Sequence, residues 1–199
     1  MIEHVTGLKV VSVFSDLTTL MPIRKRPKVE IATFGEQRLR PEDYEDVPID
    51  TEDHGTVLLR FTGGVKGVLL VCQMSAGRKN RIHFEINGSE RSIAWNGEEA
   101  NELWIGERGK VNGRLMKNPA LMSREVARYA GAPGGMAEGY LDTFKNLFGD
   151  VYVYLAEGNK PGKRRPDFPT FRVGHERLLI VDAVLKSQAT GKWVDVEES

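Results

Sequence analysis

The apolar and polar positions along the chain predict a β-rich first part and a helical second part. Apolar and β-branched residues are dense at residues 8–20, which favours a first strand that stops before Pro22. From Pro22 to Asp53, prolines and charges dominate, and only the short apolar patch at 29–34 suggests an edge strand. We therefore expect one strand followed by a long crossing loop.

Two hairpins are predicted by turn residues that lie between strand-like runs. Runs 56–61 and 65–74 flank Thr62-Gly63-Gly64, and a glycine pair supplies the positive φ angles that a tight turn requires. Runs 81–86 and 91–95 flank Asn87-Gly88-Ser89, and Asn-Gly is a strong hairpin signal. A further short strand is expected at 102–105.

Helical periodicity begins at Pro119. Apolar residues between 119 and 130 share one face and predict a helix that ends at the glycine-rich breaker after it. From Tyr140 to Leu155, apolar residues recur at steps of three and four, which predicts a helix of about five turns. A last helix is predicted at 173–185 with Gly191 closing it, followed by a strand at 192–196.

Hairpin-linked strands followed by helices are typical of an α+β fold, with helices on one face of a large, mostly antiparallel sheet. Residues 1–199 are expected to form a single domain. In the run 65–72, both alternate sets of side chains are apolar, which predicts that both faces of this strand are covered. We expect helices on one face and a second subunit or a further domain on the other.

Composition narrows the function classes. The 28 basic residues balance the 28 acidic ones, so neither nucleic acid nor an anionic membrane is an expected partner. The lone Cys72 lies in an apolar run and is interpreted as a small buried hydrophobe, not half of a disulfide. With no signal-peptide pattern and no apolar stretch of about 20 residues, a cytoplasmic protein is expected.

Motifs that bind cofactors or metals are missing from the sequence. There is no G-x-G-x-x-G and no G-x-x-x-x-G-K-[ST], so no nucleotide cofactor is assigned to this chain. Neither H-E-x-x-H nor G-x-S-x-G occurs, and the four histidines are far apart in sequence, so no metal site is predicted either.

Several polar positions are candidates for ligand contact, each with a plainer alternative. The loop 75–81 carries Arg78 and Asn80, which could bind hydroxyl or carboxylate groups, or could simply be solvated. His175 lies in the first turn of the last helix, where it could face a ligand or be a surface or capping residue. The glycine-rich segment 131–139 could let a backbone approach a ligand, or only separate two helices.

An ordered set of segments carries a resemblance to one known family. The segments are Asp53-His54-Gly55 with Leu59-Arg60-Phe61-Thr62-Gly63-Gly64-Val65-Lys66-Gly67; Gln73-Met74-Ser75-Ala76-Gly77-Arg78-Lys79-Asn80; Glu85-Ile86-Asn87-Gly88-Ser89; Asn101-Glu102-Leu103-Trp104-Ile105-Gly106; Pro133-Gly134-Gly135-Met136-Ala137-Glu138-Gly139-Tyr140; and Phe168-Pro169-Thr170-Phe171 through Gly191-Lys192-Trp193-Val194-Asp195-Val196. In this order they resemble the C-terminal domain of Gfo/Idh/MocA oxidoreductases (the glucose/fructose oxidoreductase and inositol dehydrogenase type).

The resemblance implies a sheet domain that forms the substrate pocket and the subunit interface of an NAD(P)-dependent enzyme. In the family, an N-terminal Rossmann domain holds NAD or NADP, and its catalytic lysine and Asp-x-x-x-His pair have no counterpart here. The opening segment 3–7 is similar to the stretch after that histidine, so His4 is not the catalytic one. Met136 stands where relatives commonly have a histidine.

These observations leave three functions. The first is the substrate-binding and oligomerisation domain of a sugar or polyol oxidoreductase, truncated or separately encoded, unable to transfer hydride alone, with Arg78, Asn80, Tyr140 and His175 as substrate-binding residues. The alternative is a non-catalytic binding or assembly module derived from the same family. A free-standing enzyme would need its own acid and base, for which only Asp142, Glu138 and His175 are candidates. Expected partners are a second copy of the chain, a separate Rossmann domain and a small sugar.

Overall fold

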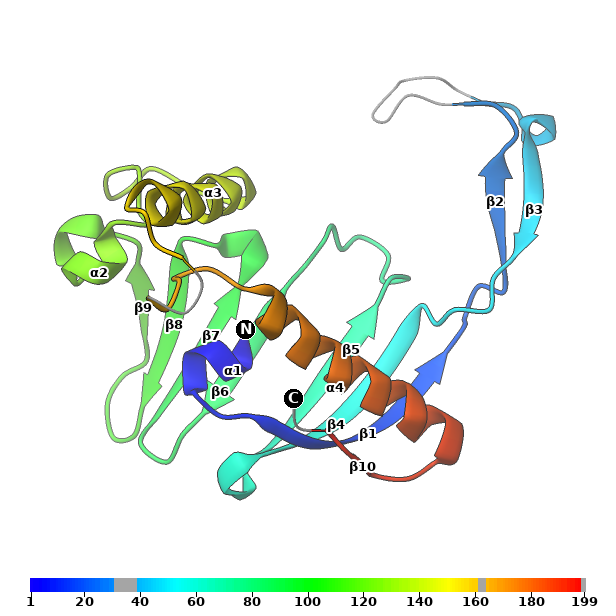
Figure 1. Cartoon of the computed structure of the whole chain (residues 1–199), viewed down its shortest axis with the longest axis horizontal. Helices are drawn as coiled ribbons and strands as arrows, with labels where there is room; N and C mark the ends of the chain where they lie inside the picture. The colour runs from blue at the N-terminus through cyan, green and yellow to red at the C-terminus, as the bar shows by residue number, and fades with distance from the viewer. Residues whose placement is uncertain (31–38, 161–163, 198–199) are drawn as a thin grey trace. The chain divides into compact units, whose positions relative to one another are not determined.

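The structure, a computed structural model, describes residues 1–30, 39–160 and 164–197 (Figure 1). The chain divides into two compact units: residues 1–76 with 171–199 form unit 1, and residues 77–170 form unit 2. The single-domain description of residues 1–199 stays a prediction. Part of the predicted edge strand at 29–34 lies outside the described residues.

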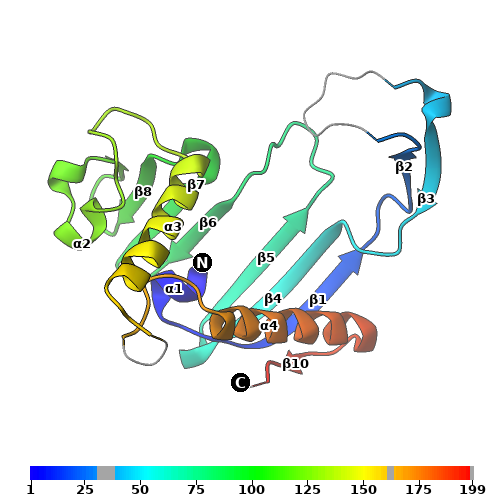
Figure 2. The same cartoon turned by 45° about the horizontal axis from the view of Figure 1, so that its top comes forward.

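Unit 1 is built on an antiparallel sheet of four strands in the order β10-β1-β4-β5. The elements of unit 1 are α1 (Ile2–Thr6), β1 (Val10–Thr18), β2 (Ile23–Pro27), β3 (Tyr44–Pro48), β4 (His54–Phe61), β5 (Lys66–Cys72), α4 (Phe171–Thr190) and β10 (Val194–Asp195). Figure 2 shows the long helix α4 running at an angle to β1 and β4. Val13, Val57 and Ala183 are buried together between this helix and the sheet. The predicted hairpin of β4 and β5 is confirmed, with positive φ at Gly63 and Gly64.

Polar side chains of α4 complete the outer edge of β1. The short strand β10 pairs with β1 only at Ser12 and Val13. Beyond that point, the backbone N–H of Ser15 donates to Oγ of Ser187 (3.1 Å), and the N–H of Leu17 donates to Oε1 of Gln188 (2.7 Å). An unpaired strand edge leaves backbone N–H groups without acceptors. Ser187 and Gln188 supply these acceptors on the part of β1 that β10 does not reach.

Strands β2 and β3 form a separate two-stranded ribbon whose base is fixed by Asp53. The side chain of Asp53 is fully buried, and it accepts hydrogen bonds from the backbone N–H groups of Leu20 (2.8 Å) and Met21 (3.0 Å). Arg24 also contacts it, at 3.3 Å. The N–H of Leu20 is the main cause that lowers the pKa of Asp53, so the carboxylate stays charged where it is buried. The segment that the sequence marked as a crossing loop therefore contains this ribbon.

The helix layer covers only part of the sheet of unit 1. Leu69 pairs with Val57 and so lies on the face that α4 covers, yet it is 46% exposed. On the other face, Val68 and Leu70 are 67% and 65% exposed. The helices therefore cover β1 and β4 but not β5, so the predicted helix cover of this strand is incomplete, and the predicted cover of its other face by a second subunit or a further domain stays a prediction.

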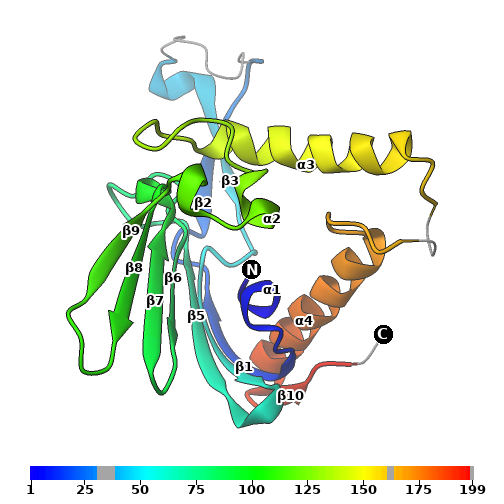
Figure 3. The ribbon, with the colours of Figure 1, turned by 90° about the vertical axis from the view of Figure 1, so that its left-hand side faces the viewer.

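Unit 2 contains a second antiparallel sheet of four strands in the order β6-β7-β8-β9 (Figure 3). Its elements are β6 (His83–Asn87), β7 (Arg91–Asn96), β8 (Glu102–Glu107), β9 (Gly113–Met116), α2 (Arg124–Ala127) and α3 (Tyr140–Ala156). Register pairs such as Phe84 with Trp95 and Ile93 with Ile105 place the apolar side chains of this sheet on one face. The opposite face carries polar residues, with the half-buried Trp104 among them.

The helices agree with the sequence in part. The predicted helix from Tyr140 and the last helix closed by Gly191, whose φ is 64°, are confirmed. The predicted helix at 119–130 is wrong in extent: a 3₁₀ turn at Pro119–Leu121 is followed by an extended Met122, and α2 has only four residues. Within the described ranges, no helix is long and apolar enough to cross a membrane. The α+β class with mostly antiparallel strands is confirmed.

Candidate functional site

A hollow of about 210 Å³ lies on the polar face of the sheet in unit 2. It exists because small residues surround Trp104. Ala94 is the direct cross-strand partner of Trp104, and Gly106 lies two residues further along the same strand, so all three share one face. A Cβ atom at Gly106 would lie only 2.5 Å from the indole ring. The ring therefore lies across Gly106, close against the strand.

Charged groups of both signs surround the hollow. Arg114, directly opposite Trp104 in the register, donates to Glu102 at 2.7 Å. This hydrogen bond raises the pKa of the Arg114 guanidinium and fixes its position. The remaining ionisable residues of the lining are Arg81, His83 and Glu99. The two guanidinium groups and the two carboxylates balance in charge.

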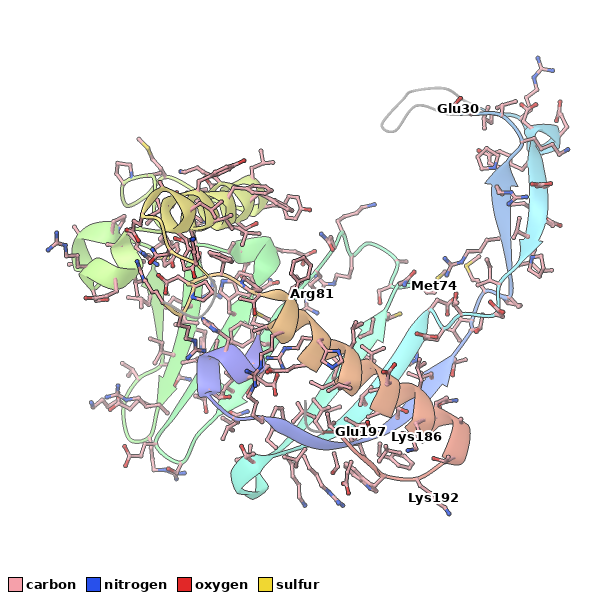
Figure 4. The ribbon with its side chains drawn as sticks, in the orientation of Figure 1. Glu30, Met74, Arg81, Lys186, Lys192 and Glu197 are labelled. Atoms are coloured by element: carbon pink, nitrogen blue, oxygen red, sulfur yellow. The ribbon has the colours of Figure 1, made fainter. Side chains whose placement is uncertain are left out.

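Arg78 and Asn80, two of the predicted contact residues, lie near the start of unit 2, shortly before Arg81, which lines the hollow. Arg78 donates to Glu98 at 3.0 Å, and the same carboxylate lies 3.9 Å from Arg81, which lines the hollow and is labelled in Figure 4. Asn80 has a φ of 60°, the left-handed conformation that asparagine tolerates better than most residues. Both Arg78 and Asn80 are exposed, so their side chains are accessible to a ligand.

Tyr140 is the first residue of α3, and its ring is 68% exposed. The ring packs edge-on against Phe144, with centroids 5.1 Å apart, and Phe144 in turn stacks on Phe148. The start of the helix is fixed by Asp142, whose carboxylate accepts the backbone N–H of Gly139 at 2.8 Å. Tyr140 is thus an exposed aromatic side chain on a well-defined helix end.

The glycine-rich segment before Tyr140 is attached to the sheet by a nearly buried ion pair. Lys117 and Glu138 are 13% and 12% exposed, and Glu138 also accepts the N–H of Gly131 at 2.6 Å. Asn101 bonds both the N–H and the carbonyl of Glu138, at 3.0 and 2.8 Å. The hydrogen bond from Lys117 is the main cause that lowers the pKa of Glu138. Glu138 therefore holds the loop, whereas a general acid would need a raised pKa.

The fourth predicted residue, His175, belongs to unit 1. It lies exposed on α4, next to Glu176, which contacts Lys9 at 3.1 Å. Within unit 2, Arg78 shares the carboxylate of Glu98 with Arg81. Tyr140 begins the row of aromatic rings on α3 that continues with Phe144 and Phe148. The substrate role of all four residues stays a prediction.

Trp104 and its hollow were missed by the sequence interpretation. Alternation along 102–106 marks one face of a strand, and the glycine two positions after a tryptophan is a usable signal that the ring can occupy the space of the missing side chain. The decisive partner, Ala94, is set by the register between β7 and β8, which no local pattern shows.

Comparisons with known proteins agree on one family. The pattern of the family described as "Oxidoreductase family, C-terminal alpha/beta domain" matches residues 14–196. The levoglucosan dehydrogenase of Pseudarthrobacter phenanthrenivorans is 31% identical over 156 residues, which is 76% of this chain and 38% of that protein.

Solved structures with a similar fold are also oxidoreductases. An oxidoreductase domain protein from Kribbella flavida superposes with a TM-score of 0.79 at 25% identity, covering 99% of this chain and 48% of that one. A levoglucosan dehydrogenase in complex with NADH and levoglucosan gives a TM-score of 0.76 at 25% identity, covering 99% of this chain and 47% of that one. The chain therefore spans less than half the length of these relatives.

Proposed function

The chain belongs to the Gfo/Idh/MocA oxidoreductases as their C-terminal alpha/beta domain, and from this premise we propose that it forms the substrate-side wall and the subunit interface of an NAD(P)-dependent enzyme acting on a sugar or polyol. The observation that carries the proposal is the likeness over nearly the whole chain to a dehydrogenase whose structure is described as a complex with NADH and levoglucosan. Hydride transfer is not assigned to this chain.

Tyr140 and Arg78 are the proposed substrate contacts in unit 2. An exposed aromatic ring can pack against the C–H face of a sugar, and an exposed guanidinium can donate to its hydroxyl groups. The ion pair of Lys117 and Glu138 supports the first contact, because it fixes the loop that leads into Tyr140. Positioning by a rigid backbone is what a binding wall requires.

The described residues do not fit a dinucleotide. Every strand pairing in the three described sheets is antiparallel, whereas a Rossmann site needs parallel strands and a glycine-rich turn into a helix. We therefore propose that NAD or NADP is held by a Rossmann domain outside this chain.

The proposed subunit interface is the face of the unit 1 sheet that lies opposite α4. Phe14, Leu58 and Val68 are register partners on this face, and Leu70 continues it. Exposed apolar areas of this kind are rare on monomers. A second copy of the chain, bringing the same face, would cover them in a twofold arrangement.

Replacing the matching half of the Pseudarthrobacter levoglucosan dehydrogenase with residues 14–196 tests the substrate role. We expect the hybrid to reduce NAD or NADP with a sugar or polyol, and Tyr140→Ala in the hybrid to raise KM with a smaller effect on kcat. Tyr152→Ala is the matched control, since Tyr152 lies in the same helix and is equally exposed, at 69%. A folded hybrid that oxidises none of a panel of sugars would instead favour the non-catalytic module.

Light scattering after size exclusion tests the interface. We expect the unmodified chain to be a dimer or larger and Val68→Lys to be a monomer, because the lysine would place a charge in the apolar contact. Val111→Lys is the control, since Val111 is 94% exposed on a turn of unit 2. A monomeric unmodified chain would contradict the proposed interface.

A further inference from the structure

We propose that the hollow around Trp104 is a second ligand site, separate from the proposed substrate wall, and that it takes a neutral sugar ring. None of the four predicted substrate contacts lines it. The inference does not depend on the proposed function, because it rests on the shape and chemistry of one face of the sheet in unit 2.

The indole of Trp104 provides the flat surface. Gly106 carries no side chain, so the six-membered ring of the indole reaches the space that a side chain there would fill, and Trp104 lines the hollow. Ala94, its cross-strand partner, is too small to occupy the space beside the ring. A tryptophan that lines a hollow offers apolar ring surface to a ligand, and its two side-chain torsions keep the entropy cost of binding small.

The polar groups around the ring select the ligand. Glu99 and Glu102 can accept from hydroxyl groups, and Arg81 and Arg114 can donate to them. Each hydroxyl group is both donor and acceptor, so a polyhydroxylated ring meets partners of both kinds. An anion gains little, because Arg114 is already paired with Glu102 at 2.7 Å and the lining is balanced in charge.

The size of the hollow also favours a single ring. Its volume of about 210 Å³ is below the roughly 300–1,000 Å³ of pockets for drug-sized ligands. A flat apolar ligand, such as another aromatic ring, would take water from the charged groups of the lining without offering them hydrogen bonds. A neutral monosaccharide can pack its C–H groups against the indole and form hydrogen bonds with the arginine and glutamate side chains.

The test is a titration of the full chain, labelled with ¹⁵N, with levoglucosan, glucose and a sugar phosphate, followed by the indole N–H signals of the three tryptophans. The spectrum of Trp104→Phe identifies the Trp104 signal. We expect that signal to shift saturably with a neutral sugar, and the sugar phosphate to bind no more tightly. Trp104→Ala should weaken binding about tenfold, as expected from the stacking energy of an aromatic group.

Gly106→Ala is the sharper variant, because its methyl group would displace the indole while leaving every polar group in place. We expect it to weaken sugar binding as much as Trp104→Ala does. Gly113→Ala, on the neighbouring strand, is the matched control, because a Cβ there meets nothing within 4 Å. If Gly106→Ala does not fold, the sugar affinities of Trp104→Ala and Trp104→Phe decide the question.

Three outcomes would overturn the proposal: no sugar-dependent shift of the Trp104 signal, tighter binding of the sugar phosphate, or unchanged binding by a folded Gly106→Ala chain. Tyr140→Ala distinguishes the two sites. It should leave the titration of Trp104 unchanged even where it impairs the hybrid dehydrogenase, so failure at one site leaves the other assignment standing.

Discussion

Replacing Ser187 by alanine should destabilise unit 1, although it removes a single oxygen atom. Ser187 is fully buried in α4, where its hydroxyl accepts the N–H of Ser15 at 3.1 Å and donates to the carbonyl of Lys192 at 2.6 Å. In the alanine variant, the buried N–H of Ser15 has no acceptor. The carbonyl of Lys192 can instead bind water, because Lys192 is exposed.

The size of the effect follows from these two bonds. A buried backbone donor without a partner costs about 1–3 kcal/mol. Alanine recovers about 0.5 kcal/mol through its higher helix propensity. The expected net loss in the free energy of unfolding is therefore about 1.5 kcal/mol, which corresponds to roughly 3–6 °C in Tm for a chain of this length.

Urea denaturation and amide hydrogen exchange measure the effect at two levels. The unfolding free energy should fall by the stated amount, and the Ser15 amide should exchange much faster while the amides of β6 to β9 keep their rates. Thr190→Ala is the control in the same helix, because Thr190 is exposed, and it should change stability by less than about 0.5 kcal/mol. A loss below about 0.5 kcal/mol in Ser187→Ala, with Ser15 exchange unchanged, would refute the idea that α4 completes the edge of β1.

Two further predictions concern the acid stability of unit 2 and the turn of unit 1. Because Lys117 lowers the pKa of Glu138 in the folded chain, its stabilising effect is complete above the ordinary glutamate pKa of about 4.3 and is lost as the pH falls through the folded value. Glu138→Gln should therefore lower stability at neutral pH and flatten the decline toward acid in urea titrations, and equal slopes for both chains would contradict this. Gly63→Ala should cost about 1 kcal/mol because φ is 74° there, whereas Gly149→Ala, in the middle of α3, should be neutral or stabilising in the same assay.

Local sequence signals predicted the elements whose conformation is determined locally. The glycine pair before Val65 and the Asn-Gly turn define their hairpins whatever the rest of the chain does. The apolar periodicity from Tyr140 similarly defines α3. These features explain why the fold class was predicted from sequence.

Elements that depend on distant partners were missed. Strand β9, Gly113–Met116, contains residues with little β-propensity and is extended because it pairs with β8. Asp53 fixes the turn before β2 through bonds to residues more than thirty positions earlier. The Trp104 hollow likewise requires the register between two strands. For the same reason, sequence alone indicated Arg78 and Tyr140 as exposed candidates but not what surrounds them.

The division of the chain has a consequence for how it is made. Unit 2 is continuous in sequence, whereas unit 1 draws on both ends of the chain, since α4 and β10 pack on β1. During synthesis, β1 leaves the ribosome long before its helix exists, so unit 2 can finish folding first. The apolar strands of unit 1 stay unshielded until residues 171–199 have emerged. Chaperones that bind nascent chains should therefore protect β1 and β4 until α4 has been made.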